Sequence, residues 1–198
     1  SIEVRIIQYT WPLQMIILSS LLYKEKLRIS KLIAVLFGFF GIVIIVVKGD
    51  FKEIYFSGIS ISLLVLVGAF CFALFSVLSK KSKVELFHFT FIIFLGGTIT
   101  SSVALIFFST FQFPSAKEIA PVIANGLLIN GISYIFWIKA LKSISVTSSA
   151  VFVFFTPILS LIWILIFFNE QFYLSYIIGG FLVLFSGMYC LKEKSSNI

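Results

Sequence analysis

Seven long apolar runs decide what this chain can fold into. They lie at about 6–23, 29–47, 58–79, 87–108, 120–138, 146–168 and 174–191. A helix needs about 20 apolar residues to cross roughly 30 Å of hydrocarbon, and it satisfies its own backbone hydrogen bonds there. The sequence therefore predicts an all-α integral membrane protein whose seven helices form a bundle.

The composition excludes a soluble domain. Of the 198 residues, 60% are hydrophobic and 12% are charged. Soluble domains average about 45–50% apolar and roughly 25% charged residues. Because so little polar surface cannot cover so much apolar surface, we expect the lipid bilayer to be the solvent for most of the chain.

Basic residues between the runs set the direction of the spans. One side carries eleven of them: Lys24, Lys26, Arg28, Lys31, Lys80, Lys81, Lys83, Lys139, Lys142, Lys192 and Lys194. The other side carries four: Arg5, Lys48, Lys52 and Lys117. The positive-inside rule places the richer side in the cytoplasm. We therefore expect a multi-pass protein of the cell (inner or plasma) membrane with a cytoplasmic C-terminus. This topology accounts for the net charge of +7, so no nucleic acid is expected as a partner.

A pattern repeats at an offset of 145 residues. The matching pairs are Pro12 and Pro157, Glu25 and Glu170, and Ser30 and Ser175. Five predicted spans separate the two glutamates, and because five is odd the two copies point in opposite directions. Inverted repeats of this kind are typical of secondary transporters.

The repeat also predicts how the chain is divided. Residues 1–50 hold the last two spans of a truncated first copy, and residues 51–198 hold a complete second copy of five spans with a cytoplasmic tail. The offset places the start of the first copy about 90 residues before Ser1. We therefore expect three further spans and an intact chain of roughly 290 residues with ten spans.

The repeated residues have local roles. Pro12 and Pro157 lie several residues inside their runs, where a proline kinks or interrupts a helix. Ser30 and Ser175 precede apolar runs and suit helix N-caps. We expect an interrupted or kinked helix in each copy.

The chain resembles the EamA-type transporters of the drug/metabolite transporter superfamily. The resemblance is carried by "WIKALKSISVTSSAVFVFFTPILSLIWILIFFNEQFYLSYIIGG", residues 137–180, through Trp137, Ala140, Leu141, Pro157, Glu170 and Gly179. The first copy supplies Pro12, Glu25 and Gly41. The glycine that the family places before each glutamate is Lys24 in one copy and Asn169 in the other. The resemblance implies ten helices around a central cavity, transport of a small metabolite or drug-like solute, and no covalent cofactor.

Three polar stripes are the candidate substrate-binding residues, because polar groups in hydrocarbon need a partner or a function. At helical spacing they are Gln8, Trp11 and Gln14, then Asn130, Tyr134 and Trp137, then Thr156 and Ser160 with Trp163. Aromatic rings can stack on a solute while amides and hydroxyls fix its orientation. The alternative is that these groups join helices to one another, or that Trp137 belongs to an interfacial aromatic belt.

No carboxylate lies in the middle of a predicted span, so the sequence names no coupling residue, metal site or cofactor. The predicted spans contain no motif of an intramembrane enzyme. They also contain no mid-span lysine, which a retinal receptor needs. A non-transporting scaffold or assembly subunit stays open as the alternative to a transporter. The oligomeric state is also open, with a homodimer among the options.

Overall fold

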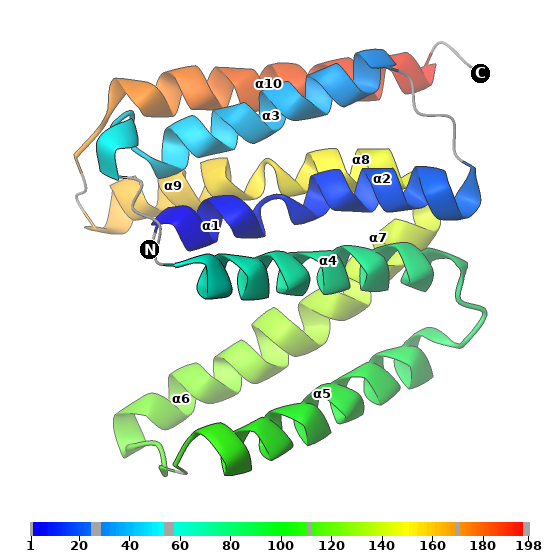
Figure 1. Ribbon diagram of the computed structural model, residues 1–198, viewed down its shortest axis with the longest axis vertical. Helices are drawn as coiled ribbons and strands as arrows, with labels where there is room; N and C mark the ends of the chain where they lie inside the picture. Colours follow the sequence, from blue (N-terminus) through cyan, green and yellow to red (C-terminus); the bar gives the residue numbers. More distant parts are fainter. Residues whose placement is uncertain (1, 25–28, 54–57, 111, 169–170, 196–198) are drawn as a thin grey trace. The chain divides into compact units, whose positions relative to one another are not determined.

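The computed structural model describes residues 2–24, 29–53, 58–110, 112–168 and 171–195. In these residues each predicted span is helical (Figure 1). In chain order, the elements are α1 (Ile2–Gln8), α2 (Trp11–Tyr23), α3 (Ile29–Val46), η1 (Phe51–Glu53), α4 (Ile59–Lys81), α5 (Leu86–Phe108), α6 (Ala116–Ala124), η2 (Asn125–Ile132), α7 (Ser133–Ser143), α8 (Val146–Val153), α9 (Thr156–Phe168) and α10 (Leu174–Ser195). The repeated glutamates, Glu25 and Glu170, lie outside the described residues.

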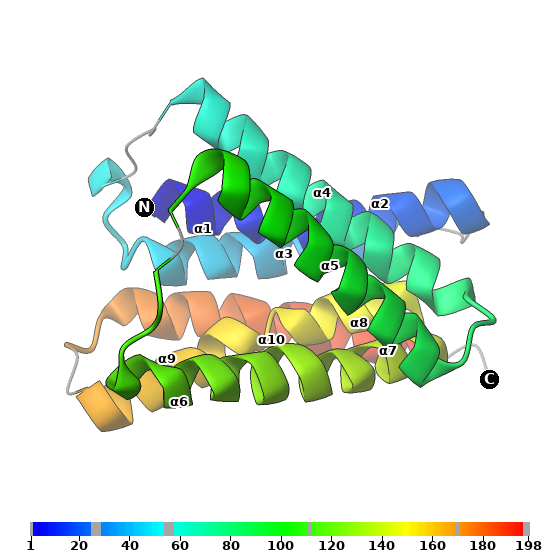
Figure 2. The same cartoon turned by 90° about the horizontal axis from the view of Figure 1, so that it is seen from below.

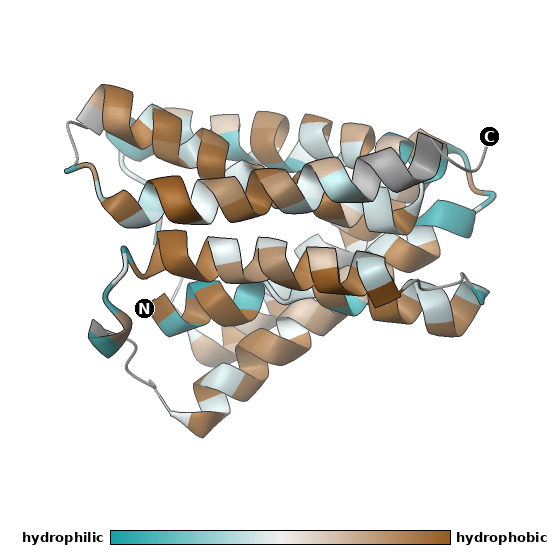
Figure 3. Cartoon of the chain, turned by 90° about the horizontal axis from the view of Figure 1, so that it is seen from above, coloured by the Kyte–Doolittle hydropathy of each residue, from teal (hydrophilic) through white to brown (hydrophobic). Residues whose placement is uncertain are grey.

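Hydrophobic residues recur along all of these helices (Figure 3). Many of their large apolar side chains are exposed. Among the described residues, four stretches are long and apolar enough to cross a membrane: Ile59–Lys81, Leu86–Phe108, Ala116–Ser143 and Val146–Phe167. The last two join consecutive helical elements. An all-α membrane bundle is therefore confirmed.

The chain packs into two compact units, residues 1–78 with 144–198, and residues 79–143. The first unit contains the two copies of the repeated pattern. Shifted by 145 residues, α2 coincides with α9 at both ends, and the start of α3 falls on the start of α10. Helix α10 lies along its counterpart α3, and α8 lies against α2.

Each copy of the pattern interrupts the helix that contains its proline, and the break comes two residues before the proline. The interruptions are Tyr9–Thr10 and Phe154–Phe155. Their hydrogen bonds also match. The Thr10 amide donates to the Ile7 carbonyl at 3.1 Å, as the Phe155 amide does to the Phe152 carbonyl at 3.1 Å. Proline has no N–H, so the carbonyl four residues before it loses its helical donor. The predicted interruption is confirmed in each copy.

Helices α3 and α10 run antiparallel and pack closely (Figures 1 and 2). The contacts along α3 and the turn after it show this direction. In chain order they are Gly38 with Ser186, Gly41 with Val183, Ile45 with Gly179, and Gly49 with Ser175. Small residues permit such close approach without a hydrophobic driving force between helices. The corresponding helices of the two copies therefore run in opposite directions.

Two positions near the repeated motif refine the sequence expectations. Ser175 lies inside the first turn of α10, and its hydroxyl has no hydrogen-bond partner, so its predicted N-cap role is wrong. Ser30 likewise lies inside α3, which begins at Ile29.

Lys24 ends α2 with φ 52° and ψ 30°, a left-handed conformation that lacks a steric penalty only for glycine. The family's preference for glycine at this position thus has a backbone reason.

The second unit consists of α5 and a continuous helix formed by α6, η2 and α7. The segment η2 is a π-helix, in which the Ser133 amide donates to the carbonyl of Leu128, five residues earlier. At the start of α5, Glu85 accepts hydrogen bonds from the Phe87 amide at 3.1 Å and the His88 amide at 3.1 Å. These two backbone bonds, and then the His88 side chain, hold the pKa of Glu85 below its usual value.

Candidate functional site

The first helix interruption gathers three of the predicted residues. The Thr10 hydroxyl donates to the Ile7 carbonyl at 2.6 Å, so this carbonyl accepts from both the hydroxyl and the amide of Thr10. The Gln14 side-chain amide donates to Thr10 Oγ1 at 2.9 Å. Its oxygen, Oε1, is buried and has no hydrogen-bond partner. The interruption therefore carries an acceptor that a bound solute could satisfy.

Aromatic surface lies beside this acceptor. Trp11 begins α2 and is half-buried, and its ring meets the Phe72 ring of α4 edge to face, with centroids 4.7 Å apart. Such pairs are favourable beyond the area they bury, so Phe72 holds the indole in place. Gln8 ends α1 and is exposed. Trp11 and Gln14 thus lie in the first turn of α2, and Gln8 lies on the other side of the interruption, at the end of α1.

The second interruption is less polar than the first. Thr156 begins α9 at the position that matches Trp11, and both Thr156 and Ser160 are exposed. Trp163 is 60% exposed and stacks on Phe167 at 5.2 Å between centroids. The predicted stripe is present on α9, and its side chains face away from the packed interior of the unit.

The stripe in the second unit begins within the π-helix. Asn130 donates through Nδ2 to Asn125 Oδ1 at 2.7 Å and to the Asn125 carbonyl at 3.1 Å. The rings of Tyr134 and Phe94 lie edge to face with centroids 5.4 Å apart. Trp137 is half-buried on α7. These three residues lie in the unit of α5–α7, whereas the other candidates lie in the unit that holds the interruptions.

Sequence reasoning missed two polar residues. Asn125 pairs with Asn130 because a π-helix places residues five apart on one face. The paired Asn-Gly dipeptides in "NGLLING" are the signal that could have indicated it. Glu3 is 3% exposed and accepts a hydrogen bond from the Ser62 hydroxyl of α4. Glu3 precedes the predicted span 6–23, whereas α1 begins at Ile2 and therefore includes it.

The sequence model of the EamA-like transporter family matches residues 1–47 and 59–191. This chain belongs to the EamA-like transporter family. The resemblance seen in the sequence is therefore confirmed, and this EamA-like protein is a multi-pass membrane protein. The family model matches in two segments, one on each side of residues 48–58.

Curated relatives of this EamA-like protein bear transporter names. It is 25% identical over 90% of its length to an uncharacterised transporter, YoaV, of Bacillus subtilis (strain 168). It is 33% identical over 80% of its length to an uncharacterised transporter of Acidianus ambivalens, encoded in the sor 3' region. A third, from Archaeoglobus fulgidus, is 29% identical over 87% of the chain. The chain spans 61–62% of the length of these relatives.

A solved structure shares the fold. A crystal structure described only as that of a protein superposes on 96% of this chain and 67% of its own, with a TM-score of 0.81 and 21% identity. At this identity the likeness concerns the fold alone, so it supports the helical architecture of the EamA-like protein.

Proposed function

We propose that this EamA-like protein takes part in moving a small metabolite or drug-like solute across the cell membrane by alternating access. Two observations support the proposal. The interrupted helices repeat at 145 residues, and α3 and α10, the corresponding helices of the two copies, run antiparallel. Similar segments inserted in opposite directions can exchange conformations and open a site to either side in turn.

The main support for a solute site is the buried side-chain oxygen of Gln14, which has no hydrogen-bond partner. A buried polar group without a partner costs roughly 1–3 kcal/mol, and discontinuous membrane helices are where transporters bind their solutes. The open acceptor, Gln14 Oε1, therefore fits a solute that donates a hydrogen bond. Trp11 supplies aromatic surface for a planar or apolar part of the same solute.

Other candidate residues are proposed as solute contacts, each to be tested separately. They are Gln8, Thr156 and Ser160 near the interruptions, and Asn130, Tyr134 and Trp137 in the α5–α7 unit. Half-burial of Asn130, Tyr134 and Trp137 supports a role within the protein. Phe94 and Asn125 already fix the orientation of Tyr134 and Asn130.

The division and topology of the chain belong to the same proposal. Residues 1–50 correspond to the last two spans of one repeat and residues 51–198 to a five-span repeat. The C-terminus lies in the cytoplasm, as the distribution of Lys and Arg favours. A test is to fuse, after residue 198, a reporter enzyme that is active only outside the cytoplasm. Activity of this fusion would contradict the proposed orientation.

Efflux from proteoliposomes tests transport and site together. Liposomes containing the protein are loaded with a mixture of small metabolites, and the solutes that leave are identified by mass spectrometry. We expect Gln14→Leu to slow efflux of the transported solute about tenfold, because a lost hydrogen bond to a buried partner is worth roughly that factor. Gln112→Leu is the matched control, since Gln112 is exposed in a connecting segment.

Two results would contradict the proposal in different ways. If no solute leaves faster than from protein-free liposomes, the protein does not transport these solutes and the scaffold alternative is favoured. If efflux occurs but Gln14→Leu leaves it unchanged, transport stands and the site assignment is wrong. Asn130→Ala and Tyr134→Ala are expected to impair efflux without lowering the amount of membrane-inserted protein.

A further inference from the structure

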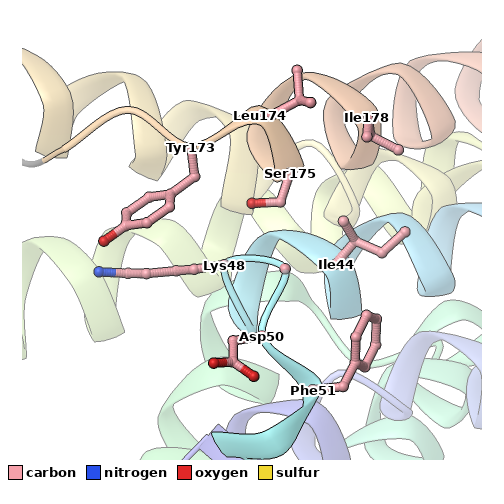
Figure 4. A pocket seen from close by; sticks show the side chains of 9 residues that line it. Ile44, Lys48, Asp50, Phe51, Tyr173, Leu174, Ser175 and Ile178 are labelled. Atoms are coloured by element: carbon pink, nitrogen blue, oxygen red, sulfur yellow. The ribbon is translucent and has the colours of Figure 1, made fainter.

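A second site lies away from the helix interruptions, where α3 ends and α10 begins. The turn after α3, the short helix η1 and the first turn of α10 line an open pocket of about 690 Å³ (Figure 4). Its polar lining includes Lys48, Asp50, Tyr173 and Ser175, and its apolar lining includes Ile44 and Ile178. None of the candidate solute contacts lines it. We propose that this pocket binds the headgroup of a zwitterionic phospholipid, phosphatidylethanolamine.

Ser175 marks the phosphate end of the pocket. Its side chain is 7% exposed, and its hydroxyl has no hydrogen-bond partner. Figure 4 shows this hydroxyl directed toward the space bordered by Tyr173 and Lys48. It lies in the first turn of the 22-residue helix α10, where backbone amides and the helix dipole favour an anion. An unsatisfied donor at a helix N-terminus fits a phosphate oxygen.

Lys48 adds positive charge at the same end. Its ammonium nitrogen lies 5.4 Å from the centroid of the Tyr173 ring, which keeps it beside the pocket through a cation–π contact. Gly49 follows with φ +86°, and a Cβ there would stand 3.3 Å from the Ser175 Cβ. The missing side chain leaves room beside Ser175.

Asp50 decides between an anionic and a zwitterionic headgroup. One of its carboxylate oxygens accepts a hydrogen bond from the Lys52 amide at 2.9 Å, and the carboxylate lines the pocket. A ligand with only negative charge would meet this carboxylate unfavourably. A headgroup with an ammonium next to its phosphate satisfies both ends, and a primary ammonium can also donate hydrogen bonds to the carboxylate.

The apolar lining indicates a lipid rather than a soluble phosphate ester. Ile44 on α3 and Ile178 on α10 come from the two apolar helices that flank the pocket. Ile178 is 48% exposed, so it offers surface for an acyl chain. The pocket lies at the ends of these apolar helices, where the headgroup region of a bilayer is expected.

Native mass spectrometry of the purified full chain tests the proposal. The protein is mixed in detergent with phosphatidylethanolamine, phosphatidylcholine or phosphatidylglycerol of equal chain length, and separately with phosphoethanolamine. We expect phosphatidylethanolamine to bind most strongly, since the methylated ammonium of phosphatidylcholine cannot donate to Asp50. Ser175→Ala should weaken its binding about tenfold, as expected for a bond to a charged group.

Charge variants sharpen the result. Asp50→Asn should remove the preference for phosphatidylethanolamine over phosphatidylglycerol, and Lys48→Gln should weaken both lipids. Lys52→Gln is the matched control, because it removes the same charge from a residue that does not line the pocket. Thermal unfolding of each variant separates lost binding from lost folding.

Three outcomes would overturn the proposal. Phosphatidylglycerol could bind as well as phosphatidylethanolamine, which would show that Asp50 does not select the headgroup. Phosphoethanolamine could bind as tightly as the lipid, which would identify a soluble ligand. Folded Ser175→Ala and Lys48→Gln proteins could retain wild-type binding, which would place any lipid elsewhere.

Discussion

Gly41 on α3 and Gly179 on α10 face each other so closely that neither can carry a side chain. A Cβ on Gly41 would stand 2.6 Å from the carbonyl oxygen of Gly179, and a Cβ on Gly179 would stand 2.5 Å from that of Gly41. The obstructing atoms belong to the backbone and cannot rotate away. The contact between the two repeat copies therefore depends on main-chain proximity at this crossing.

Gly179→Ala should destabilise the protein, and Gly180→Ala should not. A Cβ on Gly180 would meet nothing within 4 Å, and alanine favours a helix over glycine by roughly 0.5–1 kcal/mol. At Gly179 the overpacking cost of about 1–3 kcal/mol outweighs that gain. Thermal unfolding in detergent measures the difference, and equal midpoints for the two variants would contradict the close crossing.

Much of this fold could be predicted from the sequence because hydrocarbon imposes simple rules. Apolar length predicted the spans, and Pro12 and Pro157 predicted the interruptions. The crossing of α3 and α10 could not be predicted, because the contact of Gly41 with Gly179 joins residues far apart in the chain. The family pattern marks both glycines, but only the structure shows that they meet.

The sequence could predict which residues belong to the candidate site. It could not predict their hydrogen-bond partners. Trp11 and Gln14 stood out as polar or aromatic side chains in an apolar run. The open acceptor on Gln14 depends on how Thr10 is used at the interruption, which spacing does not reveal. The partnership of Asn125 and Asn130 depends on a π-helix that a 3.6-residue period cannot describe.

Lys24→Gly should stabilise the end of α2. Lys24 has φ 52°, a conformation in which the Cβ of a non-glycine residue costs roughly 1–2 kcal/mol. Glycine removes this strain but adds freedom to the unfolded chain, so we expect a net gain of about 0.5–1 kcal/mol. Thermal unfolding tests it, with Lys83→Gly in an exposed connecting segment as a control for the loss of a lysine. A lower midpoint for Lys24→Gly would argue against the left-handed conformation.

Pro12→Ala should join α1 to α2. The new amide can donate to the Gln8 carbonyl, which has no amide donor four residues on because residue 12 is proline. We expect slower hydrogen exchange at residues 11–14 and a higher unfolding temperature, since proline inside a helix costs about 3 kcal/mol. Efflux should fall if the interruption is needed for transport. Pro157→Ala should behave alike, and Pro114→Ala, in a connecting segment, is the control. Unchanged exchange would mean that packing alone interrupts the helix.

Two buried serines should respond oppositely to alanine. Ser186 is 0% exposed and its hydroxyl has no partner, so Ser186→Ala should change stability by less than about 0.5 kcal/mol or increase it. Ser148 is 6% exposed and its hydroxyl lies 2.8 Å from that of Ser145. Ser148→Ala should cost about 1 kcal/mol, the usual net value of such a bond. Similar losses in chemical denaturation for both variants would show that Ser186 has a partner.

The carboxylate of Glu85 should make the start of α5 depend on pH. The amides of Phe87 and His88 lower its pKa, so the charged form is favoured in the folded state. A depressed folded pKa contributes stability above the unfolded value, near 4.3 for glutamate, and that contribution disappears as the pH falls through the folded pKa. Near neutral pH, the amides of Phe87 and His88 should therefore be better protected in the wild-type protein than in Glu85→Gln. In acid, their protection should become equal in the two proteins. The Phe89 amide donates to the Glu85 carbonyl at 2.9 Å and should be equally protected in both proteins. Equal protection of Phe87 at neutral pH would show that the charge of Glu85 does not cap the helix.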